Sequence, residues 1–146
     1  MGNRAVITWS KEKDAEKSND LGIYLHWHGG RDSVRAFLAY CDLKKYREPD
    51  SDCYGYARLC QVIGNFFGGT VSLGIDKCCQ LDCDNGDNGV YICKGWEIVG
   101  RQYFSGNEQD EYPLLDFLKV INEAMPKDER LKDEEIERYV ASHSQQ

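Results

Sequence analysis

Residues 25–33 (LHWHGGRDS) have the types and order expected of a site that binds an anion. A strand that ends in Gly29 and Gly30 and leads into a helix would leave backbone N–H groups free at the helix N-terminus, where the helix dipole favours negative charge. Arg31 would add a guanidinium group that can hold a phosphate through two hydrogen bonds. The alternative is an ordinary strand-to-helix turn with Arg31 paired to an acid and Trp27 in the core, because the glycine spacing matches neither the Walker nor the Rossmann pattern.

The aromatic and histidine residues of this segment suggest two further roles. Trp27 or His28 could stack on a nucleobase. His26 and His28 would point to one face of a strand, as in some metal sites, but a metal site needs a third ligand and Asp32 is the only carboxylate nearby in the sequence. No His-x-Glu motif followed by Cys-x-x-Cys is present, which excludes a deaminase-type zinc site. We therefore expect no metal ion at this segment.

The seven cysteines do not predict a disulfide framework. Their number is odd and no secretory signal precedes them. Cys79 and Cys83 have the spacing of one zinc knuckle, but no second knuckle follows. The sequence leaves open whether a metal binds the cluster Cys78, Cys79, Cys83 and Cys93. We expect small buried hydrophobic residues at the cysteines of the apolar faces: Cys41, Cys60 and Cys93.

The sequence contains no arrangement that singles out a catalytic residue. There is no Gly-x-Ser-x-Gly nucleophile elbow and no pair of acids with a clear partner. The loop 82–89 (DCDNGDNG) fails the EF-hand pattern in both registers, and its two Asn-Gly pairs predict a turn. We expect no catalytic residue and no cofactor. A small nucleotide-acting enzyme stays open as an alternative, and it would need His26 or His28 for acid–base catalysis.

The hydrophobic pattern predicts an α+β fold. Alternating β-branched and aromatic residues predict strands at 4–9, 21–27, 70–76, 90–94 and 96–104. Apolar residues at helical spacing predict helices from Asp32 or Ser33 to about 46, at 54–67 and at 112–125. We expect an antiparallel sheet of about five strands with two to four helices packed mainly on one face. Residues 1–126 would form a single domain, and 127–146 an acidic C-terminal helix or tail.

Length, composition and charge exclude several classes of protein. The 146 residues suit one domain, and 12% aromatic residues are too many for a disordered chain. No apolar run approaches the roughly 20 residues that span a membrane, and the N-terminus lacks the apolar stretch of a signal peptide. The net charge is −7, and residues 105–146 hold 11 Asp and Glu against 5 Lys and Arg. An acidic chain is poorly suited to grip a nucleic-acid backbone, so we expect no direct nucleic-acid partner and no membrane partner.

Four stretches carry a resemblance to known sequences: GNRAVI at 2–7, IYLHWHGGRD at 23–32, YARLCQVIGNFFGG at 56–69 and LDCDNGDNGVY at 81–91. They resemble a family of small uncharacterised proteins from phages, prophages and mobile elements of Gram-positive gut bacteria. The resemblance covers about residues 2–104 and brings no catalytic residues with it. It implies a context, an anti-defence protein that acts in the cytoplasm of the bacterial host.

Two inhibitory mechanisms are compatible with this context. In the first, which we favour, the protein binds and sequesters a nucleotide immune signal without turnover, as anti-Thoeris and anti-CBASS sponge proteins do. A homo-oligomer could enclose such a ligand between subunits. In the second, an acidic protein binds a host defence nuclease in place of nucleic acid, as many anti-CRISPR proteins do, and truncation after Pro126 would abolish it. The residues expected to bind the nucleotide are His26, Trp27, His28, Gly29, Gly30, Arg31, Asp32, Arg35, Asn65 and Arg101.

Overall fold

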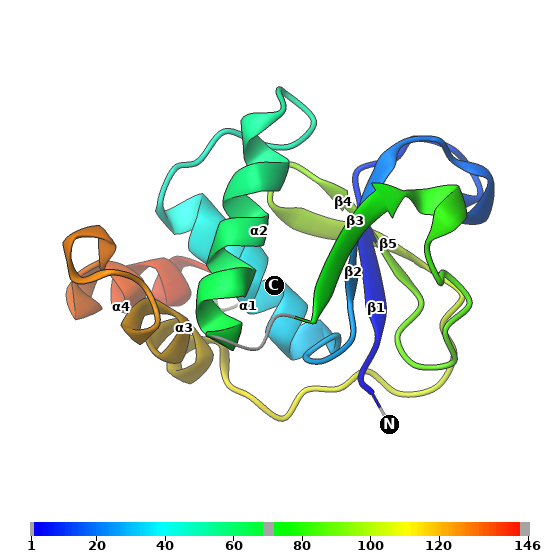
Figure 1. Ribbon diagram of the computed structural model, residues 1–146. Helices are drawn as coiled ribbons and strands as arrows, with labels where there is room; N and C mark the ends of the chain where they lie inside the picture. The colour runs from blue at the N-terminus through cyan, green and yellow to red at the C-terminus, as the bar shows by residue number, and fades with distance from the viewer. Residues whose placement is uncertain (1, 69–71, 144–146) are drawn as a thin grey trace.

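Five strands form one mixed sheet in the order β3-β2-β1-β4-β5 (Figure 1). The structure is a computed structural model and describes residues 2–68 and 72–143. The strands are β1 (Ala5–Thr8), β2 (Leu21–Leu25), β3 (Leu73–Lys77), β4 (Val90–Lys94) and β5 (Glu97–Gln102). The predicted α+β class is confirmed. Of the strand predicted at 70–76, Thr70 and Val71 lie outside the described residues.

One strand pairing differs from the antiparallel sheet expected from the sequence. β1 and β4 run parallel, with Val6 opposite Val90 and Thr8 opposite Ile92, whereas the other three pairings are antiparallel. Between these two strands the chain passes through β2, two helices and β3, so β4 returns to the free side of β1 instead of extending a hairpin. Hydrophobic alternation shows which face a side chain joins, but it does not identify the partner strand.

The two faces of the sheet bury different sets of side chains. Ala5 and Ile7 of β1 join the main core, while Val6 between them joins a smaller cluster on the other face. Two short 3-10 helices, η1 (Ala15–Lys17) and η2 (Cys78–Gln80), contribute to that smaller cluster. The period of two along each strand therefore separates a helix-covered face from a loop-covered face.

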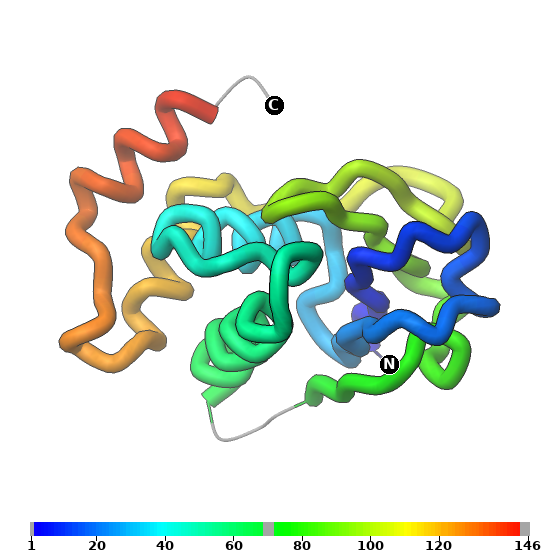
Figure 2. The backbone as a smooth tube through the Cα atoms, turned by 90° about the horizontal axis from the view of Figure 1, so that it is seen from above, coloured from blue at the N-terminus to red at the C-terminus, as the bar shows by residue number. Residues whose placement is uncertain are grey.

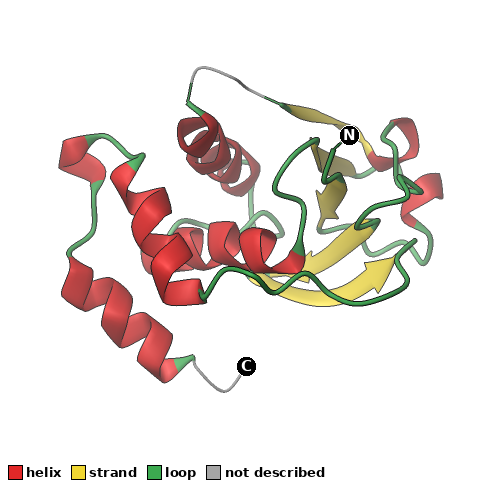
Figure 3. Cartoon of the chain, turned by 90° about the horizontal axis from the view of Figure 1, so that it is seen from below, coloured by secondary structure: helices red, strands yellow, loops and turns green. Residues whose placement is uncertain are grey.

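Four helices lie on one side of the sheet (Figures 1 and 3). They are α1 (Arg31–Leu43), α2 (Tyr54–Phe67), α3 (Leu114–Glu123) and α4 (Asp133–Ser142). Each helix buries side chains in the main core, for example Phe37, Leu59, Leu118 and Ile136. The expected packing of helices on one face is confirmed. Within the described ranges, no helix is both long and apolar enough to cross a membrane.

The α4 helix lies farthest from the sheet, beside α3 (Figure 2). It follows a third 3-10 helix, η3 (Lys127–Glu129). The buried amide of Asn122 connects this region to the core, because its Oδ1 accepts from the Tyr40 hydroxyl at 2.7 Å and from the Leu131 N–H at 2.9 Å. Ile136 is fully buried. The acidic C-terminal region therefore includes a helix that is packed against the rest of the chain.

Candidate functional site

The residues expected to bind a ligand lie at several separate places. Arg31 and Arg35 line one cavity, which we call the arginine cavity. Trp27 and His28 line a second cavity, which we call the aromatic pocket. Asp32 lines a smaller cavity of about 180 Å³ that shares both arginines with the first. The structure thus divides the predicted segment 25–33 between two binding regions.

The helix N-terminus predicted as an anion site is already engaged by the protein itself. The α1 helix begins at Arg31 with Gly30 as its N-cap, and not after a cap at Asp32 or Ser33. The Asp32 N–H donates to the Gln109 carbonyl oxygen at 3.2 Å, and the Ser33 N–H donates to the Asp32 carboxylate at 2.7 Å. These contacts use two of the N–H groups that would otherwise be free for an anion.

The two glycines before α1 admit neighbouring chain segments. A Cβ atom on Gly29 would lie 2.4 Å from the carbonyl oxygen of Asn3, and one on Gly30 would lie 2.5 Å from the side-chain oxygen of Gln109. Any other residue would therefore displace the backbone at 3 or the side chain at 109. The expectation that these glycines let a ligand approach is replaced by a structural role in close chain packing.

Asp32 connects the start of α1 to the segment 108–112. Its side chain is buried, and its Oδ2 accepts from the backbone N–H groups of Glu111 at 2.9 Å and Tyr112 at 3.0 Å. Gln109 in the middle of this segment lines both the aromatic pocket and the small cavity beside the arginines. Asp32 therefore positions a wall that the aromatic pocket shares with the small cavity.

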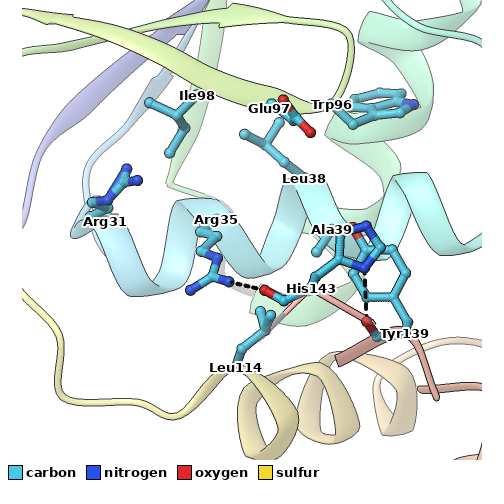
Figure 4. Close-up of a pocket in the computed structure, with 10 residues that line it drawn as sticks. All are labelled: Arg31, Arg35, Leu38, Ala39, Trp96, Glu97, Ile98, Leu114, Tyr139 and His143. Atoms are coloured by element: carbon cyan, nitrogen blue, oxygen red, sulfur yellow. Dashed lines mark hydrogen bonds between the residues drawn. The ribbon is translucent and has the colours of Figure 1, made fainter. Parts of the chain in front are cut away.

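The arginine cavity lies between α1, the start of β5 and the C-terminal end of α4, with a volume of about 350 Å³ (Figure 4). Arg31 and Arg35 are one helical turn apart on α1, which places both guanidinium groups on one side of the helix. Within residues 2–68 and 72–143, neither forms an ion pair; Arg35 donates to the carbonyl oxygen of His143 at 3.5 Å. Glu97 of β5 lines the same cavity. The two arginines thus bring two positive charges to this cavity, while Asp32, Glu108 and Asp110 line the smaller cavity that shares them.

Aromatic rings at the end of α4 form the part of the arginine cavity next to Arg35. The rings of Tyr139 and His143 are stacked with centroids 3.9 Å apart. The Tyr139 hydroxyl donates to Asp42 at 2.8 Å, and burial together with this bond raises the pKa of the phenol above its ordinary value. His143 Nδ1 lies 2.8 Å from the Tyr139 carbonyl oxygen, which can only accept, so Nδ1 carries a proton. The stacked pair supplies a flat surface beside the two guanidinium groups.

The aromatic pocket has a volume of about 330 Å³ and is lined by Asn3, Trp27, His28, Phe67, Ser72, Gln109 and Tyr112. The strand predicted at 21–27 ends at Leu25, so Trp27 leaves the expected alternation and is 43% exposed. The alternative that placed Trp27 in the core is wrong. His28 has φ +57°, which turns its ring toward Phe66 at 5.0 Å between centroids. This backbone conformation separates His28 from His26 and removes the paired orientation expected of a strand.

Burial of His28 predicts a loss of stability in mild acid. Its surroundings penalise the charged imidazolium, and this lowers the pKa below the ordinary 6.5 despite the nearby Asp32. Below about pH 6.5 the unfolded chain binds the proton first, so the free energy of unfolding should fall with pH, by at most about 1.4 kcal/mol per pH unit for this group, until the folded pKa is reached.

The His28→Asn variant should lose this part of the pH dependence, because asparagine tolerates the positive φ and does not titrate. Urea unfolding of both proteins at about pH 7.5 and about pH 5.5 measures the difference. An identical fall in the wild type and in the variant would contradict a role for His28.

The other three residues expected to bind the ligand make contacts elsewhere. His26 Nδ1 lies 3.0 Å from the Tyr24 hydroxyl, and its ring packs against Trp27. Asn65 lines a separate cavity with Arg58, and its amide lies 3.5 Å from the sulfur of Met125. Neither residue lines the arginine cavity or the aromatic pocket.

Arg101 has several internal partners, although its Nε atom is buried without a hydrogen-bond partner among the described residues. Its guanidinium lies between the rings of Tyr91 and Phe104, at 4.0 and 3.9 Å from their centroids, and forms an ion pair with Glu108. It also donates to the Asn88 carbonyl oxygen at 2.7 Å. These contacts attach the chain after β5 to the sheet, so Arg101 supports the 108–112 segment from its other end.

The cysteines are divided between the two faces of the sheet. Cys78 and Cys83 are buried in the smaller cluster, and Cys93 is buried in the main core. Cys41 is also buried there, as predicted, whereas Cys60 is only partly buried and packs against this core. Among the described residues, no three His, Cys, Asp or Glu side chains come together as a metal site.

Sequence reasoning missed the residues that complete both regions. Tyr139 and His143 come from a stretch predicted as an acidic helix or tail, and Glu97 from a predicted hairpin. Gln109 comes from a stretch with no predicted structure. The apolar residues Ile136 and Tyr139 at helical spacing were the available signal that this helix packs on the protein. No pattern indicated Gln109, because its role comes from contacts with residues about a hundred positions away.

Comparison of the chain with known proteins finds no relative. No family model matches the chain, and neither a curated protein nor a solved structure matches it. The resemblance to phage and mobile-element proteins therefore stays a prediction.

Proposed function

We propose that the protein binds a nucleotide immune signal in the arginine cavity and sequesters it without turnover. The observation that carries the proposal is the pair Arg31 and Arg35, which line one cavity and form no ion pair within the described residues. In Figure 4 the Arg31 guanidinium points toward Ile98 of β5 and the Arg35 guanidinium toward His143, so each is placed to bind a different negatively charged group of one ligand. A phosphate is the anion whose geometry matches the guanidinium fork.

The size and walls of the arginine cavity suit a nucleotide. Its volume of about 350 Å³ is within the range of small-molecule sites, which start at about 300 Å³. The stacked rings of Tyr139 and His143 offer a flat apolar surface, and Glu97 offers an acceptor for a hydroxyl or amino group. Phosphate contacts at one end and an aromatic wall at the other are the contacts a nucleotide requires. The expected anti-defence context supplies the biological role, capture of the signal in the bacterial cytoplasm.

Ligand retention tests the proposal directly. The purified protein would be incubated with extracts of bacteria whose nucleotide immune systems have been triggered, then washed and denatured, and the released molecules analysed by mass spectrometry. We expect an intact nucleotide from the wild type and none from the Arg31→Ala, Arg35→Ala double variant. Recovery of a chemically altered nucleotide would instead indicate an enzyme. Retention of nothing from any extract would contradict the proposal.

A second candidate function is supported by the acidic surface of the C-terminal region. Six acidic residues of η3 and α4 are exposed: Asp128, Glu129, Asp133, Glu134, Glu135 and Glu137. Such a row could occupy the nucleic-acid site of a defence nuclease. Truncation after Pro126 does not separate the two functions, because it would remove the buried Ile136 and the Tyr139 wall of the arginine cavity together.

Charge reversal on α4 separates the two functions. The Asp133→Lys, Glu134→Lys variant changes exposed side chains that do not line the arginine cavity and keeps the contact of Glu135 with the Lys132 N–H at the start of α4, so the fold and nucleotide retention should persist. In a plaque assay on a host that carries a defence nuclease, loss of protection with this variant would favour the nuclease inhibitor. Full protection would favour nucleotide capture.

A further inference from the structure

We propose that the aromatic pocket is a second subsite that takes the ring of a nucleobase. The pocket shares Gln109 with the small cavity, and the small cavity in turn shares Arg31, Arg35 and Leu114 with the arginine cavity. This inference rests on the proposed function, because it takes the bound ring to be the base of the sequestered nucleotide. It adds a second ring site to the aromatic wall that Tyr139 and His143 form in the arginine cavity.

Two aromatic side chains that line the pocket are exposed to solvent. Trp27 is 43% exposed and Tyr112 is 41% exposed, and both line this one pocket. They are the two most exposed residues among its aromatic lining, in a protein that buries its other two tryptophans to 7% and 6% exposure. Large aromatic surface left in water at a concave site is costly, and a planar ring stacked on it would remove that surface from water. Base stacking on such side chains is the usual way in which proteins bind a nucleobase.

The deeper wall of the aromatic pocket is held in place before any ligand binds. The His28 ring packs at 5.0 Å from Phe66, at 5.9 Å from Phe67 and at 5.9 Å from Phe117, measured between centroids. Asp32 holds the backbone of Tyr112 by a 3.0 Å hydrogen bond. The side chains of this wall therefore lose little conformational entropy when a flat ligand enters the pocket.

Two side-chain amides give the pocket a polar edge that consists of donors. Asn3 Nδ2 donates to Gln109 Oε1 at 3.0 Å, and Asn3 Oδ1 accepts from Asn88 at 2.6 Å, so both amide oxygens are in use. The Gln109 Nε2 group makes no hydrogen bond within the described residues, and it carries two N–H donors. A ring edge with nitrogen or carbonyl acceptors, as every nucleobase has, matches this arrangement.

Nucleosides without phosphate test the pocket separately from the arginine cavity. The probes are adenosine, guanosine, cytidine and uridine, with inorganic pyrophosphate as the phosphate probe. We expect at least one nucleoside to quench tryptophan fluorescence, with Trp27 as the reporter because Trp9 and Trp96 are buried. The Trp27→Phe variant should lose the signal while it still binds the nucleoside in equilibrium dialysis. The Arg31→Ala, Arg35→Ala double variant should bind the nucleoside as the wild type does.

Matched substitutions then locate the nucleoside. Tyr112→Ala should weaken nucleoside binding about tenfold or more, whereas Tyr54→Ala, which removes a tyrosine that is 52% exposed outside the pocket, should leave it unchanged. Gln109→Glu replaces the free donors by acceptors and should also weaken binding. Thermal unfolding of each variant establishes that it is folded.

Each outcome separates the ring subsite from the proposed function. Failure of all four nucleosides to bind, or equal binding by Tyr112→Ala and Tyr54→Ala, would overturn the ring subsite. Binding of pyrophosphate without any nucleoside would leave phosphate recognition in the arginine cavity and remove the subsite. Nucleoside binding, with pyrophosphate bound neither by the wild type nor by the double variant, would support the subsite and contradict the arginine cavity as the phosphate site.

Discussion

Replacement of both Arg31 and Arg35 by alanine should abolish nucleotide binding while the protein stays folded. A charged hydrogen-bond donor contributes about 1.5–3 kcal/mol, which corresponds to about 10- to 100-fold in affinity for each arginine. Arg31 has no ion-pair partner within residues 2–68 and 72–143, and Arg35 loses one 3.5 Å bond to a carbonyl oxygen, so stability should change little. Titration calorimetry with the recovered nucleotide and with inorganic pyrophosphate measures the loss.

A lysine at position 31 distinguishes geometry from charge. Arg31→Lys keeps the positive charge but loses the planar fork that binds two phosphate oxygens, so it should recover only part of the affinity. The binding constant of the wild type should also fall with added salt. Arg138→Ala is the matched control, because it removes an exposed arginine of α4 that does not line the arginine cavity. Equal affinities for Arg138→Ala and Arg31→Ala, which each remove one positive charge, would show that the effect is one of net charge.

Replacement of Asp32 by alanine should lower the free energy of unfolding by about 3 kcal/mol and weaken binding in the aromatic pocket. The carboxylate accepts backbone N–H groups of Ser33, Glu111 and Tyr112, at 2.7, 2.9 and 3.0 Å. Alanine would leave these donors without the partner that the fold provides, and a lost bond to a charged group costs about 1.5–3 kcal/mol. The 108–112 segment would be held less firmly, and it contributes Gln109 and Tyr112 to the aromatic pocket.

Two further variants make the Asp32 prediction specific. Asp32→Asn keeps an oxygen that can accept the Glu111 and Tyr112 N–H groups, so it should destabilise less than alanine. Asp84→Ala removes an exposed carboxylate of a loop and should change stability by no more than about 0.5 kcal/mol. Urea unfolding gives all three values. A loss for Asp32→Ala as small as that for Asp84→Ala would mean that the 108–112 segment is held by other contacts.

Local sequence patterns predicted the elements of the fold well. The helix expected at 54–67 is found as Tyr54–Phe67, and the five strands were all placed. Apolar spacing depends only on residues that are close in the sequence, so it predicts a helix or a strand without knowledge of the rest of the chain. The start of α1 was misplaced because Asp32, a good N-cap residue by type, instead binds the backbone of a segment about eighty positions later.

The candidate site was predicted in part. The segment 25–33 does contribute to both cavities, and Arg31 and Arg35 share one of them as their spacing on a helix requires. The predicted anion cradle at Gly29 and Gly30 is filled by other parts of the chain. Arg101 and Asn65 were grouped with the site on residue type alone, and the structure places each with other partners.

Residue order thus determined the class of fold, the face of each strand that is buried and the helical spacing of the two arginines, because each depends on contacts within about one turn or one strand. Tertiary structure alone decided the parallel pairing of β1 with β4, the exposure of Trp27, and the arrival of Gln109, Tyr139 and His143 beside residues near the N-terminus. These features depend on which distant segments meet once the whole core is packed. No local pattern records that outcome, since the free energy that selects it is shared among many contacts.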